Sequence, residues 1–192
     1  MSTARQPNLI SVEEYLDGEL ASEIKHEFVA GVVHAMAGAS NAHNIIATNL
    51  LRSVGNQLED SPCREFNSDT KVRVRTASGF RFYYPDAQVV CKPNPQSDSF
   101  QDSPVVIVEV LSDSTRRTDE EEKREYYCSI ASLNTYIMLE QAKAQAFVFY
   151  RTETGFERRV FDDPNAIIEL SDPEMKLSLT EIYRDVEFEA EA

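Results

Sequence analysis

The sequence predicts an α/β or α+β fold in which helices pack against a β-sheet. Two observations indicate this class: helical patterns alternate with short apolar, β-branched segments, and neither kind forms a block of its own. The 192 residues are 42% hydrophobic, enough to bury one good core, and the chain shows no repeat or long linker. We therefore expect a single domain over residues 1–184 and an acidic tail over residues 185–192.

Two helices are predicted in the first third of the chain. Ser11 and Glu14 have the spacing of a capping box, which indicates a short helix to about residue 21. Ser40 is placed to cap a second helix, because an apolar stripe at helical spacing follows it. The stripe consists of Ile45, Ile46, Leu50, Leu51, Val54 and Leu58.

Short strands are expected through most of the remaining sequence. The segment 27–36 (EFVAGVVHAM) is typical of two short strands around Gly31. A charged helix at about 117–130 and a short helix near 179–184 interrupt and close the pattern. Further strands are predicted at 64–75, 80–91, 105–111, 134–140, 145–151 and 156–161, with a polar loop at 92–104.

The charge of the chain limits its partners. The formal net charge is −14, from 33 acidic and 19 basic residues, and the sequence pI is about 4.6. Non-specific DNA binding uses many lysine and arginine contacts to phosphate, so this charge argues against a protein that coats DNA. A nuclease is compatible with the charge, because metal ions supply positive charge at the site itself.

The cysteines and the apolar segments indicate a compartment. Cys63, Cys91 and Cys128 are odd in number and far apart, and they match neither a disulfide framework nor a zinc-ligand spacing. The first residues lack an apolar signal core, and no apolar run approaches the roughly 18 residues that span a bilayer. We therefore expect a soluble, cytoplasmic protein with unpaired cysteines and no membrane contact.

A carboxylate interrupts the most apolar strand. In VVIVEVLS (residues 105–112), alternate residues share a face, which places Glu109 with Ile107 and Leu111 and opposite three valines. Both faces are apolar, so we expect a central, buried strand. A buried carboxylate is costly unless it is neutralised, paired or bound to a metal. Glu109 therefore needs a partner.

A second carboxylate, Asp86, follows the only proline of the preceding strand. Proline cannot donate to a β-ladder, so Pro85 marks a strand start, an edge or a bulge. If the two strands are neighbours, Asp86 and Glu109 converge, and two hard oxygen ligands suit magnesium. Two alternatives stay open: Asp86 is a turn residue after proline, or Glu109 is a buried carboxylate paired with an arginine such as Arg81.

These motifs resemble the Uma-two family of "putative restriction endonucleases", a branch of the PD-(D/E)XK nuclease superfamily. The motifs are YYPD at 83–86, VVIVEVLSDST at 105–115 and D-x-x-x-K at 119–123. Pro-Asp alone has little specificity, but the ordered set with its apolar framing has more. The resemblance extends from EFVAG to NTYIMLEQ. It implies a restriction-endonuclease-like core, with a mixed central β-sheet flanked by helices.

The resemblance also assigns residues to the site. The superfamily places a lysine two residues after the acidic residue, where this chain has Leu111. Lys123, four residues after Asp119 on the following helix, is the implied replacement; the alternative is an ordinary surface pair of small energetic value. Glu27 matches an acidic position of the family and is implied to be catalytic. His43 is a weaker candidate for contact with phosphate or metal-bound water.

The implied activity is metal-dependent hydrolysis of DNA phosphodiester bonds. Asp86, Glu109 and the Val110 carbonyl would hold Mg²⁺ (or Mn²⁺), which activates water and stabilises charge on phosphate. Lys123 would orient that water or neutralise the developing charge. We thus expect Asp86, Glu109, Lys123 and Glu27 to be catalytic.

Two further expectations concern partners. Cutting both strands of a duplex usually requires two active sites, so we expect a homodimer, with residues 147–161 offering contact surface. The alternative function is a catalytically inactive nuclease-fold protein that binds nucleic acid or another protein. The acidity of the chain and Leu111 favour this alternative slightly.

Overall fold

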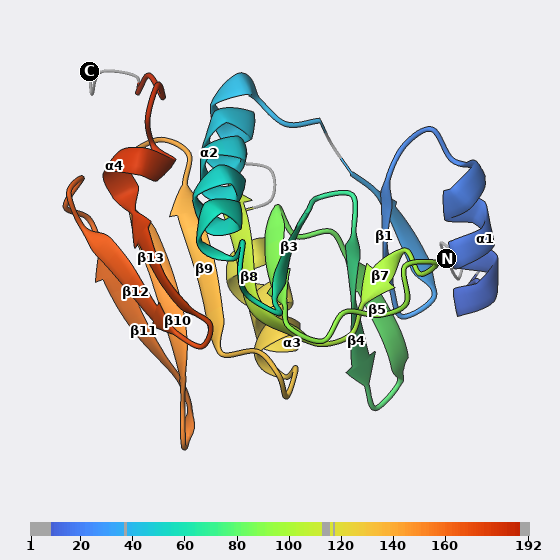
Figure 1. Cartoon of the computed structure of the whole chain (residues 1–192). Helices are drawn as coiled ribbons and strands as arrows, with labels where there is room; N and C mark the ends of the chain where they lie inside the picture. Colours follow the sequence, from blue (N-terminus) through green and yellow to red (C-terminus); the bar gives the residue numbers. More distant parts are fainter. Residues whose placement is uncertain (1–8, 37, 113–115, 117, 189–192) are drawn as a thin grey trace, which may run out of the picture.

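The computed structural model describes residues 9–36, 38–112, 116 and 118–188. Its strands form two large mixed sheets and one two-stranded sheet, with helices packed around them (Figure 1). The helical segments are α1 (Val12–Ala21), α2 (Asn41–Gln57), a π-helical turn (Thr118–Lys123), α3 (Arg124–Cys128) and α4 (Leu179–Ile182).

The six-stranded sheet has the order β11-β10-β9-β8-β6-β3, and α2 lies across it (Figure 1). Only β8 and β9 run parallel; the other neighbours in this sheet are antiparallel. Its strands are β3 (Arg64–Asn67), β6 (Ala87–Val90), β8 (Pro104–Leu111), β9 (Thr135–Glu140), β10 (Ala146–Thr152) and β11 (Gly155–Phe161).

The five-stranded sheet has the order β2-β1-β5-β4-β7, and α1 lies beside it (Figure 1). It is antiparallel except for the parallel pair of β4 and β7. Its strands are β1 (His26–Val29), β2 (Val32–Ala35), β4 (Lys71–Thr76), β5 (Gly79–Tyr83) and β7 (Phe100–Gln101). A separate hairpin joins β12 (Ile167–Ser171) to β13 (Glu174–Ser178).

The sequence prediction placed the starts of both capped helices correctly. Ser11 and Glu14 form the predicted capping box at α1, and the Ser40 hydroxyl accepts a hydrogen bond from the backbone N–H of His43 at the start of α2. The hairpin of β12 and β13 was missed by the sequence prediction. Its alternating burial, with Ile168 inside and Glu169 outside, is a pattern that could have revealed it.

The predicted strands 64–75 and 80–91 are each broken in two. Residues 64–67 and 87–90 join the six-stranded sheet, whereas the other halves, β4 and β5, join the five-stranded one. Pro85 lies at the second break, where a missing N–H ends ladder pairing. The chain therefore crosses between the two sheets at the Pro-Asp motif.

Strand β8 has the two buried faces that its sequence predicts. Val106, Val108 and Val110 belong to the core cluster that includes the inner face of α2. Ile107 and Leu111 belong to a second cluster, rich in aromatic rings, on the opposite face. Glu109 lies on that second face and is itself buried.

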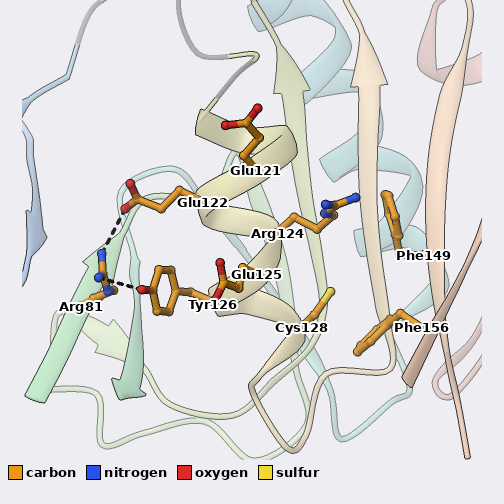
Figure 2. Close-up of a pocket in the computed structure, with 9 residues that line it drawn as sticks. All are labelled: Arg81, Glu121, Glu122, Arg124, Glu125, Tyr126, Cys128, Phe149 and Phe156. Carbon is orange, nitrogen blue, oxygen red and sulfur yellow. Dashed lines mark hydrogen bonds and ion pairs between the residues drawn. The ribbon is translucent and has the colours of Figure 1, made fainter. Parts of the chain in front are cut away.

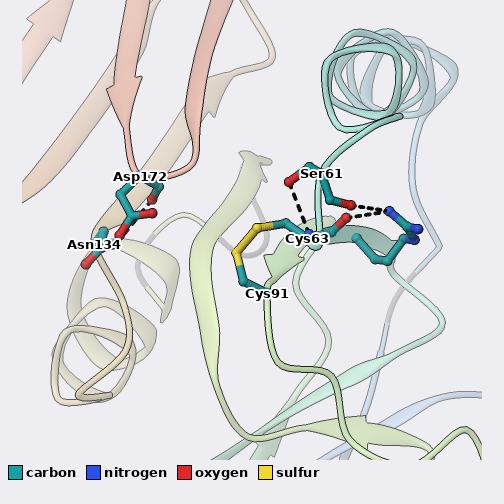
Figure 3. Close-up of a disulfide and its surroundings, with 6 residues drawn as sticks. Ser61, Cys63, Cys91, Asn134 and Asp172 are labelled. Atoms are coloured by element: carbon teal, nitrogen blue, oxygen red, sulfur yellow. Dashed lines mark hydrogen bonds between the residues drawn. A yellow bond between two sulfur atoms is a disulfide. The ribbon is translucent and has the colours of Figure 1, made fainter.

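The prediction of unpaired cysteines is wrong for Cys63 and Cys91, whereas Cys128 is free. Cys63 and Cys91 form a disulfide with an S–S distance of 1.97 Å (Figure 3). Arg64 pairs with Val90 across β3 and β6, so residues 63 and 91 are the next pair along this ladder. A separation of 28 residues gives no local signal of that pairing. The argument for a reducing compartment therefore loses its support.

The division into one domain over 1–184 and a tail from 185 stays a prediction, and residues 189–192 lie outside the described part. Among the described helices, none is both long and apolar enough to cross a membrane.

Candidate functional site

Asp86 lies where the chain passes from one sheet to the other. Strands β6 and β8 are antiparallel neighbours, with Ala87 opposite Val108, so the predicted adjacency of the two carboxylate-bearing strands is confirmed. The Oδ2 atom of Asp86 accepts a hydrogen bond of 2.7 Å from the backbone N–H of Val110. The Asp86 carboxylate therefore bonds across to β8, which a residue serving only its own turn would not do.

Lys123 joins three carboxylates from three elements. Its ammonium lies 3.0 Å from Oε1 of Glu27 on β1, 3.2 Å from Oε1 of Glu109 on β8, and 3.2 Å from Oδ1 of Asp119 on the π-helical turn. Lys123 is 5% exposed and Asp119 is 1% exposed. The alternative of an ordinary surface pair is therefore wrong, because both groups are buried.

Glu109 is held by the helical segment rather than by an arginine. Besides Lys123, the hydroxyl of Tyr127 donates a hydrogen bond of 3.0 Å to its Oε1 atom. Arg81 turns away and bonds instead to Glu122 at 3.1 Å and to the Tyr126 hydroxyl at 2.8 Å (Figure 2). The alternative pairing of Glu109 with Arg81 is therefore wrong.

The helical segment places its inward residues at intervals of four. Asp119, Lys123 and Tyr127 all point to Glu109 or to one another, and the π-helical turn sets the first two. The Tyr136 hydroxyl donates to the Asp119 carbonyl at 3.2 Å, which fixes this turn against β9. π-Helical turns occur frequently at functional sites.

His43 reaches the same region from the first turn of α2. Its Nε2 atom lies 3.2 Å from Oδ2 of Asp86, and its Nδ1 atom is buried with no hydrogen-bond partner among the described residues. Burial alone would lower the pKa of His43, but the hydrogen bond and charge of Asp86, helped by Asp119 and the Val110 carbonyl, raise it. The Asp86 side therefore favours a protonated imidazole.

Negative charge exceeds positive charge in this cluster. Burial raises the pKa of Glu109 well above its usual range, and Asp119, Asp86 and Glu27 raise it further, although Lys123 opposes them. Burial would lower the pKa of Lys123, but its three carboxylate partners raise it well above the usual value. The two directions are consistent: Lys123 faces three anions, whereas Glu109 faces one cation and three anions. The cluster therefore favours one more positive charge, either a proton on Glu109 or a metal cation.

Two carboxylate oxygens remain for such a cation. The bonds among the described residues engage Oδ2 of Asp86 and Oε1 of Glu109, and the second oxygen of each carboxylate makes none. No group of three histidine, cysteine, aspartate or glutamate side chains in the described part is arranged to hold a metal. Magnesium needs only one or two carboxylates, because it keeps several waters. The donor set therefore fits magnesium better than a metal that needs a full cage of side chains.

A cavity of about 660 Å³ lies on the other side of α3. Arg81 and Glu122 line one end of it, and Phe149 and Phe156 line the other (Figure 2). None of the residues around Lys123 lines this cavity, so its position does not mark the carboxylate cluster.

Sequence analysis identified most residues of this cluster, and it missed the roles of Tyr127 and Asp119. Glu27 and Glu109 both contact Lys123, and Asp86 bonds to the N–H of Val110, the residue after Glu109, while the catalytic roles of all four charged residues stay predictions. Sequence reasoning gave Tyr127 no role at Glu109, and it took Asp119 only as a partner of Lys123. Their spacing of four and eight residues along one helix face was the signal for both.

Comparison with known proteins shows what the chain resembles. The model of the Uma2 family, described as "Putative restriction endonuclease", matches residues 12–180. The uncharacterized protein slr1290 of Synechocystis sp. is 28% identical over 180 residues, covering 93% of this chain and 94% of the relative. The uncharacterized protein sll1609 of the same organism is 31% identical over 144 residues, covering 73% and 80%.

A solved structure shows the same fold. It is the crystal structure of "a putative nuclease belonging to DUF820" from Anabaena variabilis, which superposes with a TM-score of 0.71 at 16% identity. The match covers 91% of this chain and 97% of that chain. It confirms the predicted mixed-sheet, restriction-endonuclease-like fold.

Proposed function

The chain belongs to the Uma2 family, and from this premise we propose that it is a metal-dependent endonuclease that hydrolyses phosphodiester bonds of DNA. The observation that carries the proposal is the buried ammonium of Lys123, 3.2 Å from Glu109 in a cluster with excess negative charge. Such a cluster destabilises the fold unless a cation offsets it, and perturbed groups of this kind gather at functional sites.

Asp86, Glu109 and the Val110 carbonyl would hold the metal, Mg²⁺ or Mn²⁺. When bound, such an ion lowers the pKa of a water ligand and stabilises negative charge on phosphate oxygens. Asp86 also fixes the β8 backbone through the Val110 N–H, so the carboxylate and the carbonyl keep a constant relation.

Lys123 would donate a hydrogen bond to the attacking water or to a phosphate oxygen. Glu27 and Asp119 hold its ammonium at Glu109, and placement of a donor before reaction lowers the cost of stabilising the transition state. His43, whose Nε2 lies 3.2 Å from Oδ2 of Asp86, would be a further hydrogen-bond donor on the Asp86 side for a phosphate oxygen. Tyr127 keeps Glu109 in place through its hydroxyl.

A plasmid-nicking assay tests the proposal. We expect the purified protein to convert supercoiled plasmid to nicked or linear DNA with magnesium or manganese, and to leave it intact in EDTA. Asp86→Asn should reduce the rate at least a hundredfold, because it removes a metal-binding charge. Glu121→Gln is the control, because it also replaces a carboxylate by its amide. Glu121 is exposed and lies on the π-helical turn that carries Lys123, but its carboxylate does not contact Lys123. Cleavage that persists in EDTA, or in Asp86→Asn at the parent rate, contradicts the proposal.

The alternative remains a nuclease-fold protein that binds without cutting. The three ion pairs of Lys123 favour this alternative. They occupy the ammonium, which can bind substrate only when a cation neutralises part of the surrounding negative charge. Binding of plasmid without nicking, at saturating manganese, would select this alternative. For the enzyme we propose a homodimer as the assembly. We propose the cytoplasm as the location because its proposed substrate is DNA; the cysteines no longer support that location.

A further inference from the structure

Strand β11 forms an open edge of the six-stranded sheet. It pairs with β10 over all seven of its residues, Gly155 to Phe161, in one unbroken register. No other described strand pairs with it, and it lies at the outer end of the sheet (Figure 1). Residues 157–160 are all exposed, and Val160 is 45% exposed. Sheet edges are usually blocked by proline, a bulge or charged side chains. This edge has no proline, lysine or bulge, but it carries Glu157, Arg158 and Arg159, so an added strand must place opposite charges against them.

The other edges of the two large sheets are shorter. β3 and β2 have four residues each, and β7 has two. An added strand therefore gains most backbone hydrogen bonds at β11, because every second residue of an edge strand turns its N–H and C=O outward.

The sequence of β11 is complementary to itself. When two copies of one strand pair antiparallel about a two-fold axis perpendicular to the sheet, the axis passes midway between the two copies of one residue. That residue lies opposite its own copy, and residues opposite one another point to the same side of the sheet. With the axis at Arg158, Glu157 lies opposite Arg159 of the second copy. Phe156 then lies opposite Val160 of the second copy on the other face. Symmetry makes each of these pairs twice.

The neighbouring registers lack this match. An axis at Glu157 places Phe156 opposite Arg158, and an axis at Arg159 places Val160 opposite Arg158. Opposite charges and apolar pairs directly across a sheet stabilise it, whereas like charges destabilise it. The proposed register has one like-charge pair of its own, because Arg158 lies opposite Arg158 of the second copy. In its own chain the Arg158 guanidinium lies 4.6 Å from the centroid of the Phe147 ring, and this contact holds it over the neighbouring strand β10.

We propose that β11 docks on β11 of a second copy of this chain, antiparallel and with the two-fold axis at Arg158. This inference rests on the homodimer proposed above and specifies its surface, although the pairing itself does not depend on nuclease chemistry. The two six-stranded sheets become one continuous sheet. An axis perpendicular to the sheet keeps both copies of Glu109 on the same side. They are seven strand spacings apart, roughly 34 Å, about one turn of duplex DNA.

Charge reversal tests the register. The full chain is measured by sedimentation velocity at tens of micromolar, where we expect a dimer. Glu157→Arg and Arg159→Glu should each weaken dimerisation about tenfold or more, because each places like charges opposite one another twice. An equimolar mixture of the two single variants should form a heterodimer, since each Arg at position 157 or 159 then meets a Glu. The double variant Glu157→Arg with Arg159→Glu should dimerise like the parent. Glu169→Lys, in the exposed Glu169–Lys176 pair of the β12–β13 hairpin, is the control and should not change the dimer.

Three results would overturn the inference: a monomeric parent, single variants that dimerise like the parent, or a mixture of the two that stays monomeric. Plasmid nicking separates this inference from the proposed function. Monomeric single variants should still nick one strand, because Asp86, Glu109 and Lys123 all come from one chain, but they should produce less linear plasmid. If the parent protein shows no nicking at all, the proposed nuclease function is contradicted. The sedimentation result then still decides whether the β11 dimer forms.

Discussion

Lys123→Met is expected to lower the rate of cleavage about 10²–10³-fold and to destabilise the fold in EDTA. Methionine retains the length of the side chain and removes the ammonium that lies within 3.2 Å of Glu27, Glu109 and Asp119. Removal of one partner from a buried ion pair typically costs about 3–5 kcal/mol, because the remaining charge is left uncompensated. Loss of a positioned donor to the transition state typically lowers the rate about 10²–10³-fold.

The response to metal gives this variant a specific signature. A divalent cation can replace the missing ammonium, so manganese should raise the melting temperature of Lys123→Met more than that of the parent. Arg124→Met is the matched control, since the next residue is exposed and its guanidinium lies over Phe149, away from the cluster. A variant that melts like the parent in EDTA and cuts at the parent rate would reduce Lys123 to a packing residue.

Glu109→Gln is expected to lose cleavage and the manganese-induced rise in melting temperature, while the protein in EDTA keeps or gains stability. The amide has the shape of the carboxylate, accepts the Tyr127 hydrogen bond, and leaves Lys123 with Glu27 and Asp119. The folded state raises the pKa of Glu109, so between the usual and the raised pKa the folded chain binds a proton that the unfolded chain does not. Stability therefore falls as pH rises through this window, and the variant should lose that contribution.

Differential scanning fluorimetry in EDTA and in manganese, across this pH range, measures both effects. Glu122→Gln is the control: its carboxylate bonds to Arg81 and Tyr83 on the other side of the helix, so its manganese response should match the parent. If Glu109→Gln responds to manganese like the parent, the carboxylate does not bind the ion.

The features predicted well from sequence are those with local causes. Ser11 and Ser40 cap helices through residues three positions away, and β8 shows its two faces through alternation alone. Glu109 was identified because a carboxylate in such a strand must have a partner.

The features that were missed depend on contacts between distant segments. The pairing of Cys63 with Cys91 follows from which strands are neighbours, and that neighbourhood is tertiary. The breaks that divide β3 from β4 and β5 from β6 send strand halves into different sheets, although residues of strand type lie on both sides of each break. The burial of Lys123 could not be predicted from sequence either. A charged helix has the same sequence pattern whether one of its faces is exposed or covers a buried carboxylate.

Manganese-edge anomalous diffraction from soaked crystals of the parent tests the central claim most directly. The account predicts an anomalous peak bonded to the carboxylates of Asp86 and Glu109 and to the Val110 carbonyl, with Lys123 still beside Glu27 and Asp119. Absence of a peak at this position at saturating manganese, with the Lys123–Glu109 ion pair unchanged, would contradict it.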